Sequence, residues 1–125
     1  MDETKLKLLG ILEERAYQKV PMDVFEKEIS NINLFRHFEF LEQKGLIQLS
    51  KIRFAGTSEP QLLSAILSAK GEDFVNSFVK ELEDKCGEVV EGKGRLSRII
   101  ESAPYQIIKD VIIPIFSSCL NKISS

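Results

Sequence analysis

The stretch HFEFLEQKGLIQL, residues 37–49, decides the fold that we expect for this chain. With Leu34 just before it, Phe38 and Leu41 complete an apolar stripe at i, i+4 and i+7, which is typical of a half-buried helix. Gly45 follows the last turn and is expected in the left-handed conformation, with Leu46 folded back onto Leu41 in a Schellman motif. The apolar run after the glycine then predicts a strand.

Two helices are expected before this stretch. The first spans residues 4–17, with Glu13 on the side away from its apolar residues, which are Leu6, Leu9, Ile11, Leu12 and Ala16. The link QKVP ends in Pro21, whose fixed φ suits the entry to a second helix over residues 22–29. Polar side chains at 30–33 then favour the start of the third helix, which runs to about Lys44.

A hairpin and a fourth helix are expected after it. The runs 46–54 and 61–67 alternate as strands do, and turn-forming residues separate them at 56–60. Ser68 is expected to cap a helix that extends to Cys86 and carries an apolar stripe. The expected order is therefore three helices, a hairpin of two strands and a fourth helix.

The C-terminal part is expected to be helical. The segment 88–94 has two glycines and little periodicity, so it is expected to be a linker. A short helix over 95–102 ends before Pro104, and a longer one follows over 105–123, which Pro114 should kink or divide. We expect a domain at 1–87, the linker at 88–94 and a helical extension at 95–125. The predicted class is mainly α with a small antiparallel β-hairpin.

Composition narrows the functions that fit the chain. Its 125 residues suit one globular domain with an extension, and its net charge of −2, with no basic block, creates no general attraction to nucleic acid or membrane. The beginning MDETKLKLL lacks the apolar core of a signal peptide, so we expect a cytoplasmic protein. Cys86 and Cys119 are isolated and expected to be buried and reduced. His37 is the single histidine, and we expect no metal, no cofactor and no enzyme.

The segment FRHFEFLEQKGLI, residues 35–47, resembles the end of the recognition helix in many winged-helix regulators. The likeness rests on Leu34, Arg36, His37, Phe38, Leu41, Glu42, Gly45, Leu46 and Ile47. It implies a winged helix-turn-helix fold, in which the third helix enters the major groove of DNA and the hairpin is the wing.

A second likeness extends beyond the hairpin. ILSAKGEDFVNSF, residues 66–78, resembles the L-T-x-x-G-H-x-F-L segment of a domain-of-unknown-function family of short bacterial proteins, often encoded by prophages. Ser68 stands at the threonine position, Gly71, Asp73 and Phe74 match, and Glu72 replaces the histidine. This likeness implies a winged helix followed by a C-terminal helical tail, and so covers nearly the whole chain.

DNA contacts are expected from the outer face of the third helix and from the hairpin. The candidates are Asn33, Arg36, His37, Lys44, Lys51 and Arg53, because arginine suits guanine, asparagine suits adenine and lysine suits phosphate. Glu39 and Glu42 border the same face and oppose binding through like charge. An alternative is a surface for a protein partner at Phe35 and Phe40, although Phe40 can equally pack against the C-terminal helices.

Two features of the C-terminal half remain open. The stripe Ile108, Val111, Ile112, Ile115 and Phe116 either folds back on the first helix or pairs with a second copy in a homodimer. GEVVEGKG, residues 87–94, nearly matches a phosphate-binding loop, but Gly94 occupies the place of its Ser or Thr and the segment follows a helix, so we expect a chance match. We expect a small, non-catalytic winged-helix regulator that associates with DNA, or a winged-helix module that binds protein instead.

Overall fold

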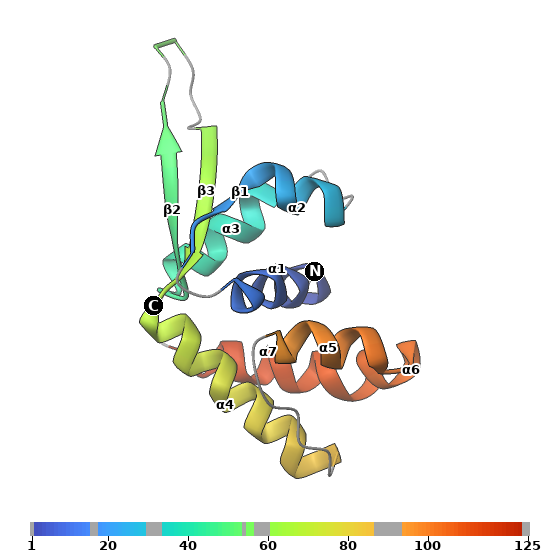
Figure 1. Ribbon diagram of the computed structural model, residues 1–125. Coiled ribbons are helices and arrows are strands. Elements are labelled where there is room, and N and C mark those ends of the chain that lie inside the picture. Colours follow the sequence, from blue (N-terminus) through green and yellow to red (C-terminus); the bar gives the residue numbers. More distant parts are fainter. Residues whose placement is uncertain are drawn as a thin grey trace.

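The computed structural model describes residues 2–15, 18–29, 34–53, 55–56, 61–86 and 94–123 (Figure 1). The expected cap at 30–33, the hairpin tip at 57–60 and the linker at 88–93 lie outside these residues. The elements are α1 (Asp2–Glu14), β1 (Val20–Pro21), α2 (Met22–Glu28), α3 (Leu34–Gln43), β2 (Ile47–Ile52), β3 (Gln61–Leu67), α4 (Ala69–Cys86), α5 (Arg95–Ser102), α6 (Tyr105–Ile107), the π-helix η1 (Ile108–Ile112) and α7 (Ile113–Asn121). The predicted class, mainly α with a small antiparallel hairpin, is confirmed.

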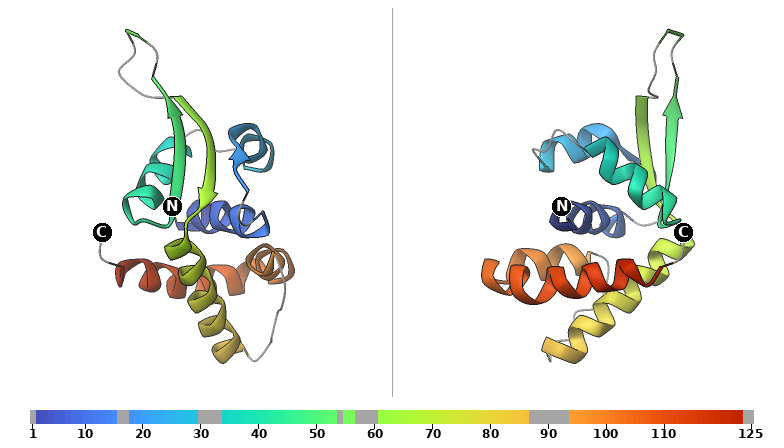
Figure 2. Two further views of the ribbon diagram at one scale, coloured as in Figure 1. Left: turned by 60° about the vertical axis from the view of Figure 1, so that its left-hand side comes forward. Right: turned by 180° about the vertical axis from the view of Figure 1, so that it is seen from behind.

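The sheet has three antiparallel strands in the order β1-β3-β2. The hairpin of β2 and β3 was predicted, and it projects beyond the helices (Figure 2). Strand β1 was not predicted, because two residues are too few to show a period of alternation. Val20 pairs with Ala65 and Pro21 with Ser64, so the link before α2 also forms an edge strand.

The expected Schellman motif at the end of α3 is confirmed. The Leu46 N–H donates to the Leu41 carbonyl at 3.0 Å, and the Gly45 N–H donates to the Glu42 carbonyl at 2.9 Å. Gly45 has φ of 80°, which glycine adopts without steric cost. Leu41 and Leu46 are both fully buried, so the chain enters β2 from the core.

The expected cap of α4 is confirmed as well. The Ser68 Oγ accepts a hydrogen bond from the Gly71 N–H at 2.9 Å, as a capping serine does three residues before the amide that it satisfies. The same hydroxyl donates to the Gly45 carbonyl at 2.5 Å. One side chain therefore joins the start of α4 to the end of α3.

Helix α1 is the centre of the molecule. It lies between α2 and α3 on one side and α5 and α7 on the other (Figures 1 and 2). Both sides of α1 are therefore covered, and Leu8 is as fully buried as the predicted Leu6, Leu9 and Leu12. The assignment of Glu13 to an outer face is wrong, because its exposed fraction is 7%.

Glu13 is buried with its hydrogen bonds satisfied. Its Oε2 lies 3.2 Å from the Arg95 Nε, and its Oε1 accepts from the Leu96 N–H at 2.9 Å. The carboxylate thus caps the start of α5, where backbone N–H groups have no helical partner. The Arg95 Nη2 also donates to the Asn76 Oδ1, which links α1, α5 and α4.

The C-terminal helices fold back on the rest of the chain. Phe116 of α7 is fully buried and lies edge-on to Phe74 and Phe78 of α4, with ring centroids 5.8 and 5.4 Å apart. The helix passes through the π-helical turns of η1 before Pro114, where the Ile113 N–H bonds to the Ile108 carbonyl. This turn is where the predicted interruption by Pro114 occurs.

No helix within the described ranges combines the length and the apolar character that crossing a bilayer requires.

Candidate binding surface between α2, α3 and the hairpin

Arg36 and Arg53 are the expected DNA contacts that the structure leaves open to a ligand. Both side chains are exposed, Arg36 on α3 and Arg53 just after β2. Neither forms an ion pair with another described residue. Asn33, the candidate for adenine recognition, lies outside the described residues.

Lys44 and Lys51 are engaged within the molecule. The Lys44 amine donates to the Ile123 carbonyl at 3.2 Å, which ties the end of α3 to the end of the chain's last described turn. The Lys51 amine lies 2.7 Å from Glu42 Oε1 in an ion pair. A phosphate would have to compete with these partners, so both lysines stay candidate DNA contacts that already have an internal partner.

His37 belongs to the core side of α3, and its assignment to the outer face is wrong. Its exposed fraction is 8%, beside the fully buried Phe38. The buried face of α3 is wider than the stripe at i, i+4 and i+7 predicted, because α1 packs against this helix in addition to the sheet.

Phe40 is half-buried, and its ring lies close to two lysine side chains. The Lys5 amine of α1 lies 4.8 Å from the centre of its ring and the Lys44 amine 5.7 Å, which are cation–π distances. The ring is half-buried against the core. The packing that the structure shows for Phe40 is against the core and Lys5 of α1, and its role in binding a partner stays a prediction.

The dimerisation stripe is internal. Ile108, Ile112, Ile115 and Phe116 are all buried in the core of a single chain, and Val111 is half-buried against it. Of the two alternatives for this stripe, folding back on the first helix is the one observed. The expected interface for a second copy at these residues is corrected for that reason, while the homodimer itself stays a prediction.

The described residues give no support to phosphate binding at the near-match to a phosphate-binding loop. Lys93 lies outside the described residues, and Arg95 is held by Glu13 and Asn76. Within the described part of the chain, no group of His, Cys, Asp and Glu side chains is placed to hold a metal ion.

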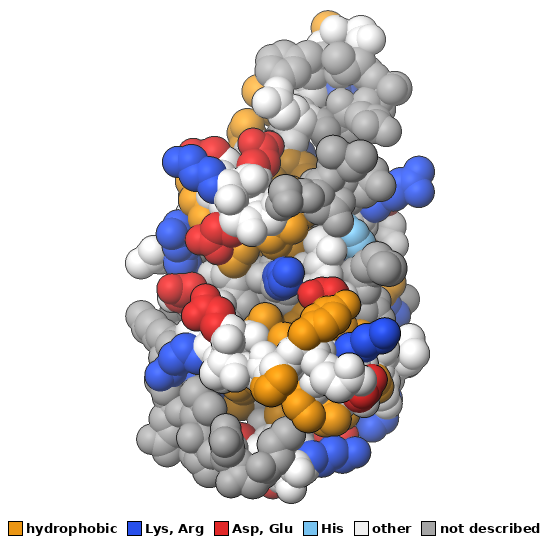
Figure 3. All heavy atoms as spheres, turned by 90° about the vertical axis from the view of Figure 1, so that its right-hand side faces the viewer, with side chains coloured by type: hydrophobic (Ala, Val, Ile, Leu, Met, Phe, Trp, Pro, Cys, Tyr) orange, Lys and Arg blue, Asp and Glu red, His pale blue; other side chains and the backbone are white. Residues whose placement is uncertain are grey.

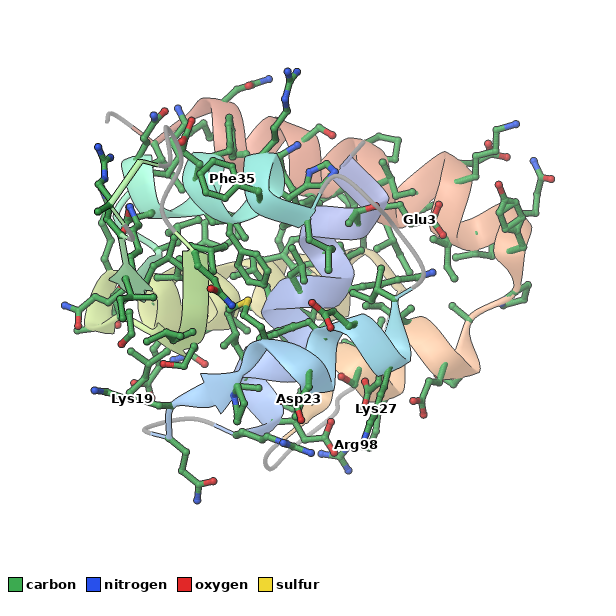
Figure 4. All side chains as sticks on the ribbon, turned by 90° about the horizontal axis from the view of Figure 1, so that it is seen from above. Glu3, Lys19, Asp23, Lys27, Phe35 and Arg98 are labelled. Carbon is green, nitrogen blue, oxygen red and sulfur yellow. The ribbon has the colours of Figure 1, made fainter. Side chains whose placement is uncertain are left out.

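Phe35 lines a groove, as a partner-binding residue would. The groove has a volume of about 680 Å³ and lies between α2, the first turn of α3 and the start of β3. Figure 4 shows Phe35 on α3 and Asp23 on α2 from above. The groove is lined by Met22, Asp23, Glu26, Leu34, Phe35, Phe38, Gln61, Leu62 and Leu63.

A bulge in β3 exposes Leu63 beside this groove. Ser50 pairs with Ser64 and Lys51 with Leu62, so Leu63 has no partner residue in β2. Such a bulge redirects the extra side chain, and Leu63 is 48% exposed while Leu62 packs against the core. Leu63 was not predicted to be a site residue, because regular alternation with Ala65 and Leu67 places it on the buried face.

Charges elsewhere on the surface are mixed. Figure 3 shows Lys and Arg side chains interspersed with Asp and Glu on the side of the molecule that faces right in Figure 1. Apolar side chains gather over the lower part of this view, and Tyr105 and Ile107 at α6 are 65% and 40% exposed. This face therefore has no cationic patch for a polyanion among its described residues.

No family model, curated protein or solved structure matches the chain.

Proposed function

We propose that the chain is a non-catalytic winged-helix module that binds a protein partner through the groove between α2, α3 and β3. The order helix, strand, helix, helix, strand, strand, helix, with a three-stranded antiparallel sheet, supports the winged-helix assignment. Cys119, an unpaired cysteine, supports action in the reducing cytoplasm.

The observation that carries this proposal is the lining of the groove. Six of its nine described lining residues are apolar, Phe35 and Leu63 among them, although polar and apolar atoms share its surface about equally. Its charged residues within the described part of the chain are Asp23 and Glu26, both exposed. Carboxylates at this position repel DNA phosphates, whereas apolar side chains in a groove favour a protein ligand.

DNA binding is the second candidate, because Arg36 and Arg53 are exposed on α3 and at the end of β2. In a winged-helix protein these elements face the duplex, and arginine is suited to guanine and to phosphate. With Lys44 and Lys51 engaged elsewhere, two of the expected cations remain open in one copy of the chain. A regulator of transcription would need further cations, for example from a homodimer.

Fluorescence anisotropy with labelled random duplex DNA separates the two functions. The protein-binding proposal predicts no binding at moderate salt, and at most a weak, non-specific increase at low salt. Binding retained at moderate salt, with log K falling by about 0.9 per phosphate contact against log salt, and abolished in the variant Arg36→Ala/Arg53→Ala, would overturn it in favour of DNA.

The protein-binding function is tested directly by asking whether partner capture depends on the groove. Proteins cross-linked in cells to the wild-type chain are compared with those cross-linked to Leu63→Asp and to Ile52→Asp. Ile52 is a matched control, because it is 41% exposed on β2 and does not line the groove. A partner lost with Leu63→Asp and kept with Ile52→Asp supports the proposal. An identical set of partners for all three chains contradicts it.

A further inference from the structure

We propose that the groove binds an extended peptide segment of the partner, with apolar and basic side chains, which adds to the outer edge of β3 as an extra strand. This inference rests on the protein-binding function proposed for the same groove. It specifies the conformation and the charge of the segment that binds.

The outer edge of β3 is only partly covered. Strand β1 pairs with Ser64 and Ala65, and no described strand lies beside Gln61, Leu62 or Leu63 on that side. The edge of a sheet presents backbone N–H and C=O groups that an extended chain can pair with. A bound segment would continue the line of β1 past Pro21 and lie between β3 and α2, which begins at Met22 and itself contacts β3.

Leu63 marks the place where this strand would dock. The sheet register leaves it without a partner residue in either β1 or β2, and its side chain is 48% exposed at the groove. Strand addition uses main-chain hydrogen bonds for affinity and pockets for alternate side chains for specificity. Here the half-buried Phe35 and Leu62 provide apolar walls for such side chains.

The opposite edge of the sheet, on β2, is protected against pairing with another strand, in contrast to the open part of β3. The Leu49 N–H on β2 donates to Glu42 Oε2 at 3.3 Å, and Lys51 forms its ion pair with the same carboxylate. An edge with a satisfied amide and a lysine resists pairing with another chain. The β2 edge of a second copy is therefore a poor partner for β3, and two copies paired through β3 would bring the carboxylates of Asp23 and Glu26 together. The occupant that we infer is for these reasons a segment of another protein.

Charge at the groove specifies the segment further. Asp23 and Glu26 project from α2, and none of the described residues that line the groove is Lys or Arg. A lysine or arginine in the bound segment would complement these carboxylates, and an acidic segment would be repelled.

The test uses short random peptides displayed on phage and selected on the full-length wild-type chain. We expect selected peptides to alternate apolar residues and to contain Lys or Arg. Their affinity should fall at least about tenfold for Leu63→Asp and for Asp23→Lys/Glu26→Lys, and stay unchanged for Ile52→Asp. Circular dichroism of each variant verifies that it folds.

Backbone pairing is tested on one selected peptide with synthetic N-methyl analogues. N-methylation at alternate residues should weaken binding by about tenfold, because it removes donors that pair with β3, and methylation at the residues between should not. Amide hydrogen exchange at Gln61–Leu63 should slow when the peptide binds.

The outcomes distinguish the two levels of inference. Peptides that depend on Leu63 but tolerate N-methylation everywhere overturn strand addition and leave the protein-binding groove in place. Selected peptides without Lys or Arg, unaffected by Asp23→Lys/Glu26→Lys, overturn the inferred charge. Failure to select any peptide that depends on Leu63 overturns the inference, and together with DNA binding at moderate salt it also overturns the proposed function.

Discussion

Gly71 meets the backbone of Leu46 so closely that no side chain fits between them. A Cβ placed on Gly71 would lie 1.9 Å from the Leu46 carbonyl oxygen. The same carbonyl accepts the Ser68 N–H at 3.0 Å, so the start of α4 is held against the residue that leads into β2. A backbone contact of this kind cannot be relieved by rotating a side chain, and it requires glycine.

The variant Gly71→Ala should therefore lose about 3 kcal/mol of unfolding free energy, since α4 must move away from Leu46. Urea denaturation measures the loss. Gly10→Ala is the control, because its Cβ would lie 3.0 Å from the Ser97 Oγ, the end of a side chain that can rotate. Equal stability of the two variants would contradict the close contact.

Removal of the Glu13 carboxylate should destabilise the docking of α5. In Glu13→Ala, Arg95 loses its partner and the Leu96 N–H its acceptor, which should cost about 3 kcal/mol in thermal or urea unfolding. Glu3→Ala is the matched control, because Glu3 forms an exposed pair with Lys7 at 3.6 Å, and such pairs contribute about 0.5 kcal/mol or less. A similar small loss in both variants would show that the buried pair adds nothing.

Substitution of Phe38 should mainly lower the stability of the fold, whereas substitution of Phe35 should mainly weaken peptide binding. Phe38 is fully buried, with its ring edge-on to Phe25 at 4.9 Å, so Phe38→Ala should cost roughly 3 to 5 kcal/mol. Phe35 is half-buried at the groove, and Phe35→Ala should cost about 1 kcal/mol while it weakens peptide binding. A nearly unchanged Tm for Phe38→Ala would refute its place in the core.

Cys119 should behave as a poorly reactive thiol. Burial, and then the hydrogen bond that its Sγ donates to Glu81 Oε2 at 3.1 Å, raise the pKa of the thiol from 9.0 to about 11, against an opposing effect of Lys122. In the variant Cys86→Ala, the thiolate fraction of Cys119 near pH 8 should be roughly a hundredfold lower than that of an ordinary cysteine. Alkylation by iodoacetamide should be slower by the same factor. The rate should rise through a midpoint near pH 11.

The same shift of pKa affects stability in alkaline solution. The unfolded thiol ionises near 9.0 and the folded one near 11, so its contribution to stability is complete below pH 9 and is lost as the pH rises from 9 to 11. Glu81→Gln keeps an acceptor but removes the charge, and should lower the pKa of Cys119 and speed alkylation. An unchanged midpoint in Glu81→Gln would show that Glu81 has no electrostatic effect on the thiol.

Elements that depend on neighbours in sequence were predictable. The left-handed Gly45 with Leu46, the capping Ser68 and the β2–β3 hairpin all follow from turn chemistry within a few residues. The exposure of Arg36 was also predicted from the helical period of α3. In each case the physical cause, a backbone conformation or a helix face, lies inside one short segment.

Tertiary structure alone decided which faces are buried and where the groove lies. Glu13 is interior because α1 is covered from two sides, and His37 is interior because both α1 and the sheet pack on α3. The C-terminal stripe is interior because it packs on α1 and α4. Leu63 is exposed because a bulge shifts its register against β2. These outcomes depend on contacts between residues far apart in sequence, and local periodicity carries no information about which distant element will cover a given face.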